Sequence, residues 1–479
     1  MNIIWLKRDL RLSDHLPLDF CEKNNKNYFF IYIFEPSIIE YPDTSLRHLQ
    51  FIYHSILLMN KELKKFNRKI SIYYGESDKI FNYIIKHNNI DGIYSYQESG
   101  TLITYKRDLY LKKIFKKNKI CWTEYQRDGI IRGIKNRLGW DQNWFSTMNT
   151  PISNTQISIS TSTDKLKCKF PMNLALLDKL KNYPHSYKKP GETEAKKTLI
   201  SFADSRGFNY SKYISKPNES RKSCGRISPY LAWGNISVKQ AYQYIKNHQN
   251  YKYNKRSFNG LLTRLKWRCH FIQKFEVEPE IEKACANRGF ESLKKTNDPK
   301  LIQSWEDGIT GIPLVDANMR CLIKTGWINF RMRAMLVSIF CHQFDCDWRK
   351  GAHHLARLFL DYEPGIHYSQ FQMQAGTTGI NAVRIYNPIK QSYDHDEEGI
   401  FIKKWVEELK HHSKEDVHEP WGVSPILKNI YYKNCKYPNP VLDLKKASTK
   451  ARKKIWNHKK SSQVFNDNYR ILKLHTRNN

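Results

Sequence analysis

Five short apolar runs near the start of the chain constrain its fold more than any other feature. They are rich in β-branched and aromatic residues, and roughly 15 to 40 residues separate each run from the next, which is enough for a helical crossover. Strands that alternate with helices predict an open, parallel α/β sheet over about the first 130 residues. The five predicted strands are Ile3–Leu6, Tyr28–Phe34, Ile70–Tyr74, Gly92–Tyr96 and Ile120–Tyr125.

Two common nucleotide-binding motifs are missing from the sequence. No Gly-x-Gly-x-x-Gly follows the first apolar run, and no Gly-x-x-x-x-Gly-Lys-Ser/Thr occurs anywhere in the chain. In both motifs the glycines let backbone N–H groups approach a phosphate closely. A dinucleotide-binding Rossmann site and a P-loop ATPase therefore lose most of their support.

Beyond the α/β region the sequence changes character twice. The periodicity fades from 131 to 195, and the polar, low-complexity stretch 156–165 is typical of a surface linker. From residue 196 onward the apolar spacing is helical. We therefore expect an α/β domain (1–130), an interdomain linker (131–195) and an all-helical domain (196–479) with a basic tail.

Several helix starts in the second half carry clear signals. Ser237 followed by Gln240 is a capping box, and Asp298 followed by Pro299 places an N-cap before a proline at the first helical position. Helical spacing is clearest at 261–276, 316–324, 331–344 and 348–360.

The chain is strongly basic. Lys and Arg number 80 and Asp and Glu 46, which gives a formal net charge of +34. Such a charge indicates a polyanionic partner, most simply nucleic acid, but a biased Lys- and Asn-rich composition would produce it too. The tail has the same two interpretations, a solvated helix face or a phosphate-binding segment. Its cations are Lys445, Lys446, Lys450, Arg452, Lys453, Lys454, Lys459 and Lys460.

Cysteine usage and hydropathy indicate a cytoplasmic protein. The ten Cys are scattered, with no Cys-x-x-Cys pair, which argues against a disulfide framework and a zinc site and suits a reducing compartment. No apolar run approaches the roughly twenty residues that a membrane span needs, and the N-terminus lacks the pattern of a secretory leader.

The densest cluster of unusual residues runs from 305 to 396. Here Arg331, Arg333, Asp361 and Glu363 stand among apolar and aromatic neighbours, where charges are seldom buried unless they are paired or bind a ligand. A simple salt-bridge network is the alternative, and for an isolated Arg/Asp pair it would be favoured. The Gly, Pro and Thr residues at 364–379 indicate a shaped loop, which favours the ligand interpretation.

These motifs resemble those of the photolyase/cryptochrome family, in particular its bacterial deoxyribodipyrimidine photolyase-like branch. The resemblance runs from residue 1 to roughly 410 and rests on segments such as WLKRDLRLSDH (5–15), TGIPLVDANMR (310–320) and DYEPGIHYSQFQMQAGTTG (361–379). It implies an α/β antenna domain, a long linker and a helical domain that holds FAD in a bent conformation at the bottom of a DNA-facing cavity.

The resemblance also implies a set of cofactor-binding residues. SCGRISPYL (223–231) is similar to the family's phosphate-binding segment, although a Cys stands at 224 where a hydroxyl residue is usual. Arg333 and Asp361 would pair beside the isoalloxazine ring, and His367 replaces the Asn that usually faces the flavin's reactive nitrogen. The implied cofactor set is Tyr213, Cys224, Gly225, Arg226, Ile227, Ser228, Arg268, Arg333, Asp361, Tyr362, Glu363 and His367.

The residues that would meet DNA depart from the family pattern. Trp267 would stack on a flipped base, but Arg264 replaces a Glu that usually bonds the lesion, and Met373 stands where a second Trp is common. Phe330 and Ala334 occupy the places of the two His found in enzymes that repair (6-4) photoproducts. The implied DNA-binding set is Arg264, Trp267, Phe330, Arg331 and Met373.

The family's three-Trp electron chain is incomplete in this sequence. Trp348 matches its middle member, Phe371 occupies the flavin-proximal place, and no Trp lies near 294–296. Tyr368, Tyr386 or Trp327 would offer another route. The implied catalytic set is His367, Arg333, Asp361 and Trp348.

The resemblance implies light-driven repair by a monomer. Reduced FAD would donate an electron to a cyclobutane pyrimidine dimer in UV-damaged DNA. The changes at 264, 367, 371 and 373 keep a second hypothesis open, a cryptochrome-like photoreceptor without repair activity. A folate or deazaflavin antenna would bind near Tyr96, Gln97 and Glu98, for which packing at a sheet edge is an equal alternative.

Overall fold

The computed structural model describes residues 1–162, 165–433 and 435–475. The described chain forms two compact units, and each of them is discontinuous in sequence. Unit 1 comprises Met1–Ser205, Gly225–Glu282 and Leu360–Ile366. Unit 2 comprises Arg206–Cys224, Lys283–Phe359 and His367–Asn479. The expected domain boundaries at 130 and 195 remain a prediction.

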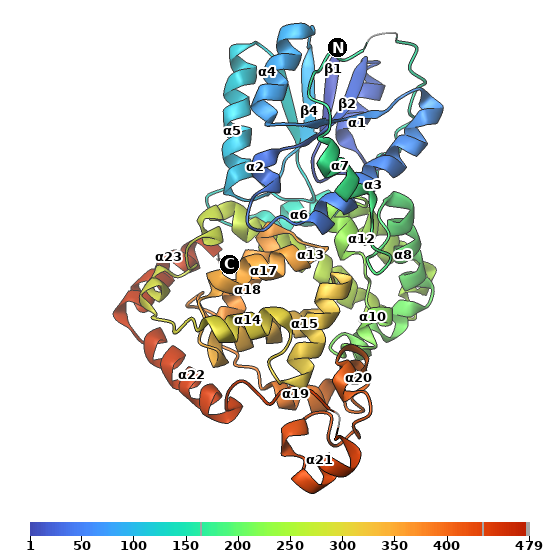
Figure 1. The fold of residues 1–479 in the computed structure, drawn as a ribbon. Coiled ribbons are helices and arrows are strands. Elements are labelled where there is room, and N and C mark those ends of the chain that lie inside the picture. Colours follow the sequence, from blue (N-terminus) through green and yellow to red (C-terminus); the bar gives the residue numbers. More distant parts are fainter. Residues whose placement is uncertain (163–164, 434, 476–479) are drawn as a thin grey trace. The chain divides into compact units, whose positions relative to one another are not determined.

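Unit 1 contains the predicted parallel sheet. Its five strands lie in the order β3-β2-β1-β4-β5, and every neighbouring pair is parallel. Helices α4 and α5 cover one face of the sheet, while α1 and α3 cover the other (Figure 1). The bounds are β1 (Asn2–Leu6), β2 (Tyr28–Phe34), β3 (Ile70–Tyr74), β4 (Gly92–Tyr96), β5 (Cys121–Tyr125), α1 (Leu16–Lys23), α2 (Pro36–Ile39), α3 (Leu46–Leu63), η1 (Lys64–Phe66), α4 (Ser77–His87) and α5 (Leu102–Lys117).

The core of the sheet explains why these strands form. Ile3 and Trp5 of β1 alternate onto the same face, where they pack with Ile93 of β4 and with Phe81 and Phe115 of the covering helices. All five side chains are at most 1% exposed. An alternation of apolar residues that buries one face in this way specifies the register of each strand.

The remaining helices of unit 1 place the residues of the candidate site. The capping box at Ser237 forms as predicted, since its side chain accepts from the backbone N–H of Gln240. Gly234 lies just before it with φ of 76°, and a Cβ there would lie 2.2 Å from the carbonyl oxygen of Arg8. These helices are α6 (Trp140–Asn149), α7 (Leu174–Lys181), α8 (Glu192–Asp204), α11 (Ser228–Trp233), α12 (Val238–Asn247), η3 (Gln249–Tyr251), α13 (Lys255–Val277) and η4 (Pro279–Glu282).

Unit 2 consists of helices and the loops that connect them, with no strand among its described residues. The predicted start at Asp298 is confirmed, because its side chain accepts from the backbone N–H of Lys300 at the beginning of α14. Most elements are short: η2 (Arg206–Asn209), α9 (Tyr210–Tyr213), α10 (Ser220–Ser223), η5 (Arg288–Ser292), α14 (Pro299–Asp307), α15 (Pro313–Thr325), α16 (Phe330–Ser338), η6 (Ile339–Gln343) and α17 (Trp348–Leu358). The later ones are α18 (Pro364–Ala375, which begins in unit 1), α19 (Pro388–His395), α20 (Ile400–Trp405), η7 (Glu407–Leu409), η8 (Pro420–Gly422), α21 (Pro425–Tyr431), α22 (Leu444–Lys459) and α23 (Ser462–His475).

One predicted helix changes its winding. The spacing at 331–344 predicts a single helix, but α16 ends at Ser338 and a π-helical turn, Ile339–Gln343, follows it. The hydroxyl of Ser338 donates to the carbonyl of Arg384, a contact that sequence spacing does not reveal.

Three further expectations concern the chain as a whole. None of the helices in the described ranges is both long and apolar enough to cross a bilayer. All ten cysteines are free thiols. The predicted linker 156–165 has no regular secondary structure where it is described, and positions 163 and 164 lie outside the described residues.

Candidate functional site

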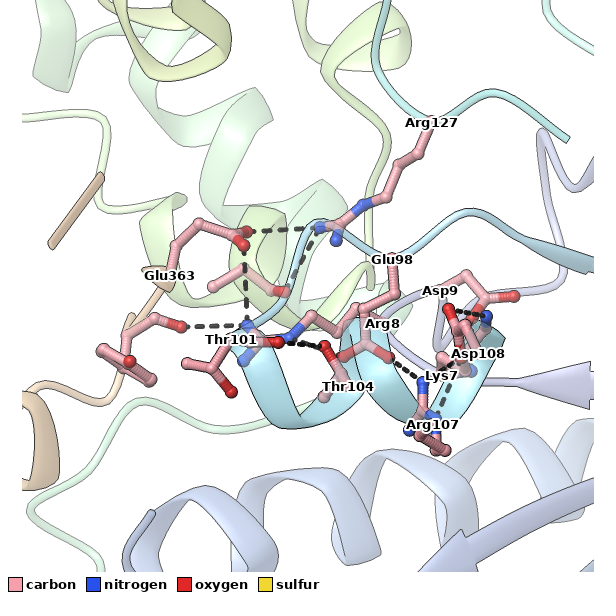
Figure 2. Close-up of polar contacts among 12 residues, drawn as sticks. Lys7, Arg8, Asp9, Glu98, Thr101, Thr104, Arg107, Asp108, Arg127 and Glu363 are labelled. Atoms are coloured by element: carbon pink, nitrogen blue, oxygen red, sulfur yellow. Dashed lines mark hydrogen bonds and ion pairs between the residues drawn. The ribbon is translucent and has the colours of Figure 1, made fainter. Parts of the chain in front are cut away.

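A buried group of opposite charges in unit 1 contains two of the predicted cofactor residues. The Arg268 guanidinium lies 2.8 Å from the carboxylate of Glu363 and 3.2 Å from that of Asp128. Arg127 approaches the same Glu363 oxygen at 3.5 Å, and Figure 2 shows this contact. All four side chains are at most 10% exposed. Charges this deeply buried must be paired, and each member of this group has a partner.

Electrostatics keep Arg268 charged despite its burial. Burial alone would lower its pKa, but the negative charges of Glu363 and Asp128 more than offset this and raise the pKa. For Arg127 burial prevails and lowers the pKa. Arg268 therefore presents a permanent positive charge in a dry environment.

Helix α13 presents a large aromatic ring next to this buried charge. Trp267 precedes Arg268 directly but points outward, and 45% of its surface is exposed. The guanidinium of Arg264, one turn earlier, lies 6.0 Å from the Trp267 ring centroid. An exposed Trp beside a cation is a suitable platform for a nucleic-acid base. The structure thus brings together two of the predicted DNA-binding residues, Arg264 and Trp267.

The segment predicted to bind the pyrophosphate forms a tight turn at the start of α11. Arg226 has φ of 57°, which is left-handed backbone, and the helix begins at Ser228 after Ile227. A Cβ at Gly225 would lie 3.1 Å from a methyl carbon of Leu261 in α13. Left-handed turns that lead into a helix expose backbone N–H groups, so this segment of unit 1 fits a phosphate.

Unit 2 brings two more predicted residues around a phenylalanine. The Arg333 guanidinium stacks 4.0 Å above the Phe359 ring, and its Nε donates to the carbonyl of Ile328. His367 meets the same ring edge-on, with centroids 6.2 Å apart. Its Nε2 lies 2.8 Å from the carbonyl oxygen of Ala352. Because a carbonyl only accepts, Nε2 carries a proton.

The predicted electron-transfer residue lies in a buried aromatic cluster of unit 2. Trp348 is 6.4 Å from Tyr368 and 6.5 Å from Phe371, measured between ring centroids. His367 is 5.6 Å from Phe371 and 5.4 Å from Tyr368, which links this cluster to the Arg333–Phe359 stack. Of the three predicted alternatives to the Trp chain, Tyr368 lies here.

The other predicted residues are distributed over both units. Asp361 is buried in unit 1, so its pairing with Arg333 of unit 2 remains a prediction. Tyr362 is also in unit 1, where its hydroxyl donates to Asp43 and its ring stacks on His48. Unit 2 holds Tyr213, Cys224, Phe330, Arg331 and Met373.

A pocket lies in unit 1, and about 790 Å³ of unfilled space, which includes its opening to solvent, lies within its bounds. It opens at the carboxyl ends of β1 and β2, the usual place for ligands in open α/β sheets. Of the three residues expected near an antenna, Glu98 lines the pocket. Tyr96 instead donates its hydroxyl to the carbonyl of Asp14.

Charged side chains dominate one wall of this pocket. Arg107 donates to Glu98 at 2.6 Å (Figure 2). It also donates to Glu35 at 2.8 Å, and the Arg8 guanidinium stacks 4.4 Å from the Trp233 ring. Burial would raise the pKa of Glu98, but Arg107, with Lys7 and Arg8, lowers it. The pocket therefore combines fixed charges with aromatic surface.

Sequence reasoning missed several of these residues. Phe359, which joins Arg333 to His367, carries no sequence signal beyond being apolar. Arg127 and Asp128 directly follow the fifth strand, and charges at that place in an open α/β sheet are a usable signal. Arg8 stands within the motif 5–15 but is absent from the predicted site residues.

Comparison with known proteins decides the family. A model described as "DNA photolyase" matches residues 2–131, and one described as "FAD binding domain of DNA photolyase" matches residues 261–457. The chain belongs to the photolyase/cryptochrome family. Its parallel sheet and helical second half are the expected fold, and FAD is its cofactor.

Relatives of this photolyase/cryptochrome chain carry two kinds of name. A deoxyribodipyrimidine photo-lyase of Alkalihalophilus pseudofirmus is 26% identical and aligns over 94% of this chain and 97% of its own length. A cryptochrome DASH of Danio rerio is 25% identical, over 92% and 90%. The crystal structure of an archaeal photolyase from Sulfolobus tokodaii with two FAD molecules superposes with a TM-score of 0.78, at 25% identity, over 95% of this chain and 100% of that one.

Proposed function

We propose that this protein repairs DNA by splitting cyclobutane pyrimidine dimers in blue light. The observation that carries the proposal is the pair Trp267 and Arg268 on α13, one half-exposed and the other buried and ion-paired. The exposed ring would stack against an extruded lesion base. The substrate would be DNA carrying UV photoproducts, bound by a monomer in the cytoplasm.

The cofactor residues in each unit would hold FAD in an electrostatically fixed environment. When bound and reduced, FAD supplies a light-driven electron to the dimer and accepts it back after the ring has opened. The turn at Gly225 and Arg226 would receive the pyrophosphate. Arg268 stays charged beside Glu363, so its field needs no reorganisation when negative charge develops nearby.

His367 would set the proton at the flavin's reactive edge. The carbonyl of Ala352 accepts from Nε2 at 2.8 Å, and this contact fixes the orientation of the imidazole ring. A histidine in this place can change charge near neutral pH, unlike the family's usual Asn. Repair by the His367→Asn variant should therefore depend less on pH between about 5 and 8 than repair by the wild type.

The buried cluster of unit 2 would carry electrons to the cofactor. Trp348 and Tyr368 lie 6.4 Å apart between ring centroids, and both are at most 3% exposed. This route would serve in place of the family's flavin-proximal Trp, whose position Phe371 occupies here. Photoreduction of oxidised FAD should slow in Trp348→Phe and Tyr368→Phe, while repair by chemically reduced protein is unchanged.

The unit 1 pocket would bind an antenna chromophore. The archaeal relative is described with two FAD molecules and the implication of a novel light-harvesting cofactor. The pocket here offers Arg8, Arg107 and Trp233 to a planar, anionic molecule. Mass spectrometry of the compounds released on denaturation would identify a folate, a deazaflavin or a second flavin. FAD alone, from protein purified without light, would remove this proposal.

A cryptochrome-like photoreceptor is the second candidate function. The relatives named cryptochrome DASH favour it, as do the residues at 264, 367, 371 and 373. Under this alternative the predicted DNA-binding residues would not need to recognise a pyrimidine dimer.

A repair assay separates the two functions. Chemically reduced protein is mixed with an oligonucleotide that carries one thymine dimer, in single- or double-stranded form, under blue light and in darkness. We expect dimer loss only in light, and we expect Trp267→Ala to weaken it. Loss of a (6-4) photoproduct instead, or no loss with FAD bound and reduced, would overturn the cyclobutane assignment.

A further inference from the structure

Helix α22 has two faces of different chemistry. Ala451 and Ile455 are buried, and this side of the helix packs on the π-turn η6. The opposite side is exposed and mostly cationic. Its members are Lys445, Lys446, Thr449, Lys450, Arg452, Lys453, Trp456, Asn457 and Lys460, the last one at the C-cap.

The inward-facing lysines of this region are already used by the fold. Lys454 binds the carboxylate of Asp345 at 2.7 Å, and Lys459 donates to the carbonyl of Asn381 at 3.0 Å. The outward-facing cations differ. Apart from Lys446, which lies 3.7 Å from Asp443, the structure records no carboxylate partner for them among the described residues. Apart from that one pair, these exposed cations lie together with no recorded carboxylate partner among the described residues, and such a patch favours an anionic partner.

Helix α23 follows after two residues and adds aromatic surface. Val464 and Ile471 are buried, and this helix packs on η5. Phe465 and Tyr469, four residues apart, project from the exposed side with 74% and 75% of their surface accessible. Trp456 is 44% exposed in the last turn of α22. The two helices, orange and red in Figure 1, thus carry cations and exposed rings on consecutive segments.

This combination suits an unpaired nucleic-acid strand better than a lipid surface. A helix that lies in a membrane needs a free apolar face, but the apolar sides of α22 and α23 are already packed inside unit 2. The exposed side offers cations and rings with a single aliphatic residue, Leu472. Backbone charges with interleaved aromatic rings are the general features of single-strand binding.

We propose that the α22–α23 pair is a second DNA-binding surface that takes single-stranded DNA without sequence preference. The cations of α22 contact successive phosphates, and Trp456, Phe465 and Tyr469 stack on bases. From Lys445 to Lys460 the helix spans about 22 Å at roughly 1.5 Å per residue, the length of a few nucleotides. None of its residues belongs to the cofactor or lesion-binding sets, so the surface acts independently of the chemistry.

The first test compares two triple variants with the same change in net charge. Lys450, Arg452 and Lys453 are replaced by Gln in one protein, and the exposed Lys113, Lys116 and Lys117 of α5 in the other. Binding of dye-labelled, undamaged (dT)20 is followed by fluorescence anisotropy in darkness from 50 to 300 mM salt.

We expect the α22 variant to lose affinity by at least tenfold at low salt. Its log–log salt slope should fall by about 2, since each lost single-strand phosphate contact removes roughly 0.7. The α5 control should keep the wild-type slope. Equal losses in the two variants would show that only bulk charge matters and would overturn the proposal.

The second test concerns the rings. Tyr469→Ala should weaken (dT)20 binding by about tenfold without changing the salt slope, because stacking releases no counterions. The control Tyr110→Ala, also on an exposed helix face, should bind like the wild type. No loss in Tyr469→Ala would remove the stacking contribution and the single-strand assignment with it.

Two further measurements distinguish single-strand binding from membrane binding and from a role in catalysis. In pull-down with phosphatidylserine vesicles, the wild type and the α22 variant should both bind weakly and to the same extent. An α22 variant that loses vesicle binding but keeps (dT)20 binding would show that this surface binds a membrane and not single-stranded DNA. Single-turnover repair at saturating protein should be unaffected in the α22 variant. Because binding is measured on undamaged DNA in darkness, failure of the repair proposal would leave this test intact.

Discussion

Replacement of Glu363 by Gln tests whether the buried charges of unit 1 act as one structural group. The carboxylate lies 2.8 Å from Arg268 and 3.5 Å from Arg127, and 1% of its side chain is exposed. Two charges 4 Å apart attract by about 4 kcal/mol at an effective dielectric constant of 20. Removal of one partner of such a buried pair costs about 3 to 5 kcal/mol, because the other charge stays buried without compensation.

We expect Glu363→Gln to lower the free energy of unfolding by about 3 kcal/mol, the lower end of that range, because the amide oxygen still accepts from one arginine. Urea unfolding followed by circular dichroism measures this loss. The matched control is Glu407→Gln, which removes an exposed pair with Lys410 at 3.1 Å and should cost less than about 1 kcal/mol.

Weaker binding of FAD by the variant would also lower the apparent free energy of unfolding. Unfolding at two FAD concentrations separates the effects, since only the affinity contribution changes with ligand concentration. A double-mutant cycle with Arg268→Met should show coupling of more than about 1 kcal/mol. A loss for Glu363→Gln no larger than for Glu407→Gln would refute the reasoning.

Three further predictions concern other parts of the chain. Burial, with Lys295 nearby, lowers the pKa of His342 to about 4, so between pH 6.5 and 4 the unfolded chain binds a proton that the folded chain does not. The stabilisation is fully present above pH 6.5, and the free energy of unfolding should fall by about 3 kcal/mol as the pH drops to 4. In urea titrations at several pH values, His342→Gln should reduce this pH dependence of the free energy of unfolding. Gly234→Ala should lower the free energy of unfolding by more than about 2 kcal/mol in the same assay, because position 234 has a positive φ and the carbonyl of Arg8 lies close to it. An unchanged midpoint of urea unfolding would contradict the turn geometry. Trp267→Ala should weaken binding of a dimer-containing oligonucleotide by about 1 to 3 kcal/mol with unfolding unchanged; equal binding by both proteins would exclude it as the stacking ring.

The sequence predicted the elements whose signals are local. The first strand was recognisable because it is a short, continuous apolar run, all of which is buried, and the capping box at Ser237 needs only residues three apart. The π-turn after Ser338 was not predicted, because a contact with Arg384, distant in sequence, accompanies the change of winding.

The candidate site was predicted only in part, for the same reason. Resemblance to a family identified Arg268, Glu363 and His367, but the partners that fix them are dispersed along the chain. Arg127 comes from the loop after β5, and Phe359 follows α17. A pairing between residues so far apart has no periodicity or motif that a single sequence reveals.

The central claim is that bound FAD and light together reverse a DNA lesion. The most direct measurement counts, in one sample, the FAD bound per chain and the thymine dimers lost from a defined oligonucleotide after blue-light exposure of reduced protein. We expect close to one FAD per chain, several dimers lost per chain in light and none in darkness. A protein that carries reduced FAD and binds the oligonucleotide, yet loses no dimer in light, would contradict it.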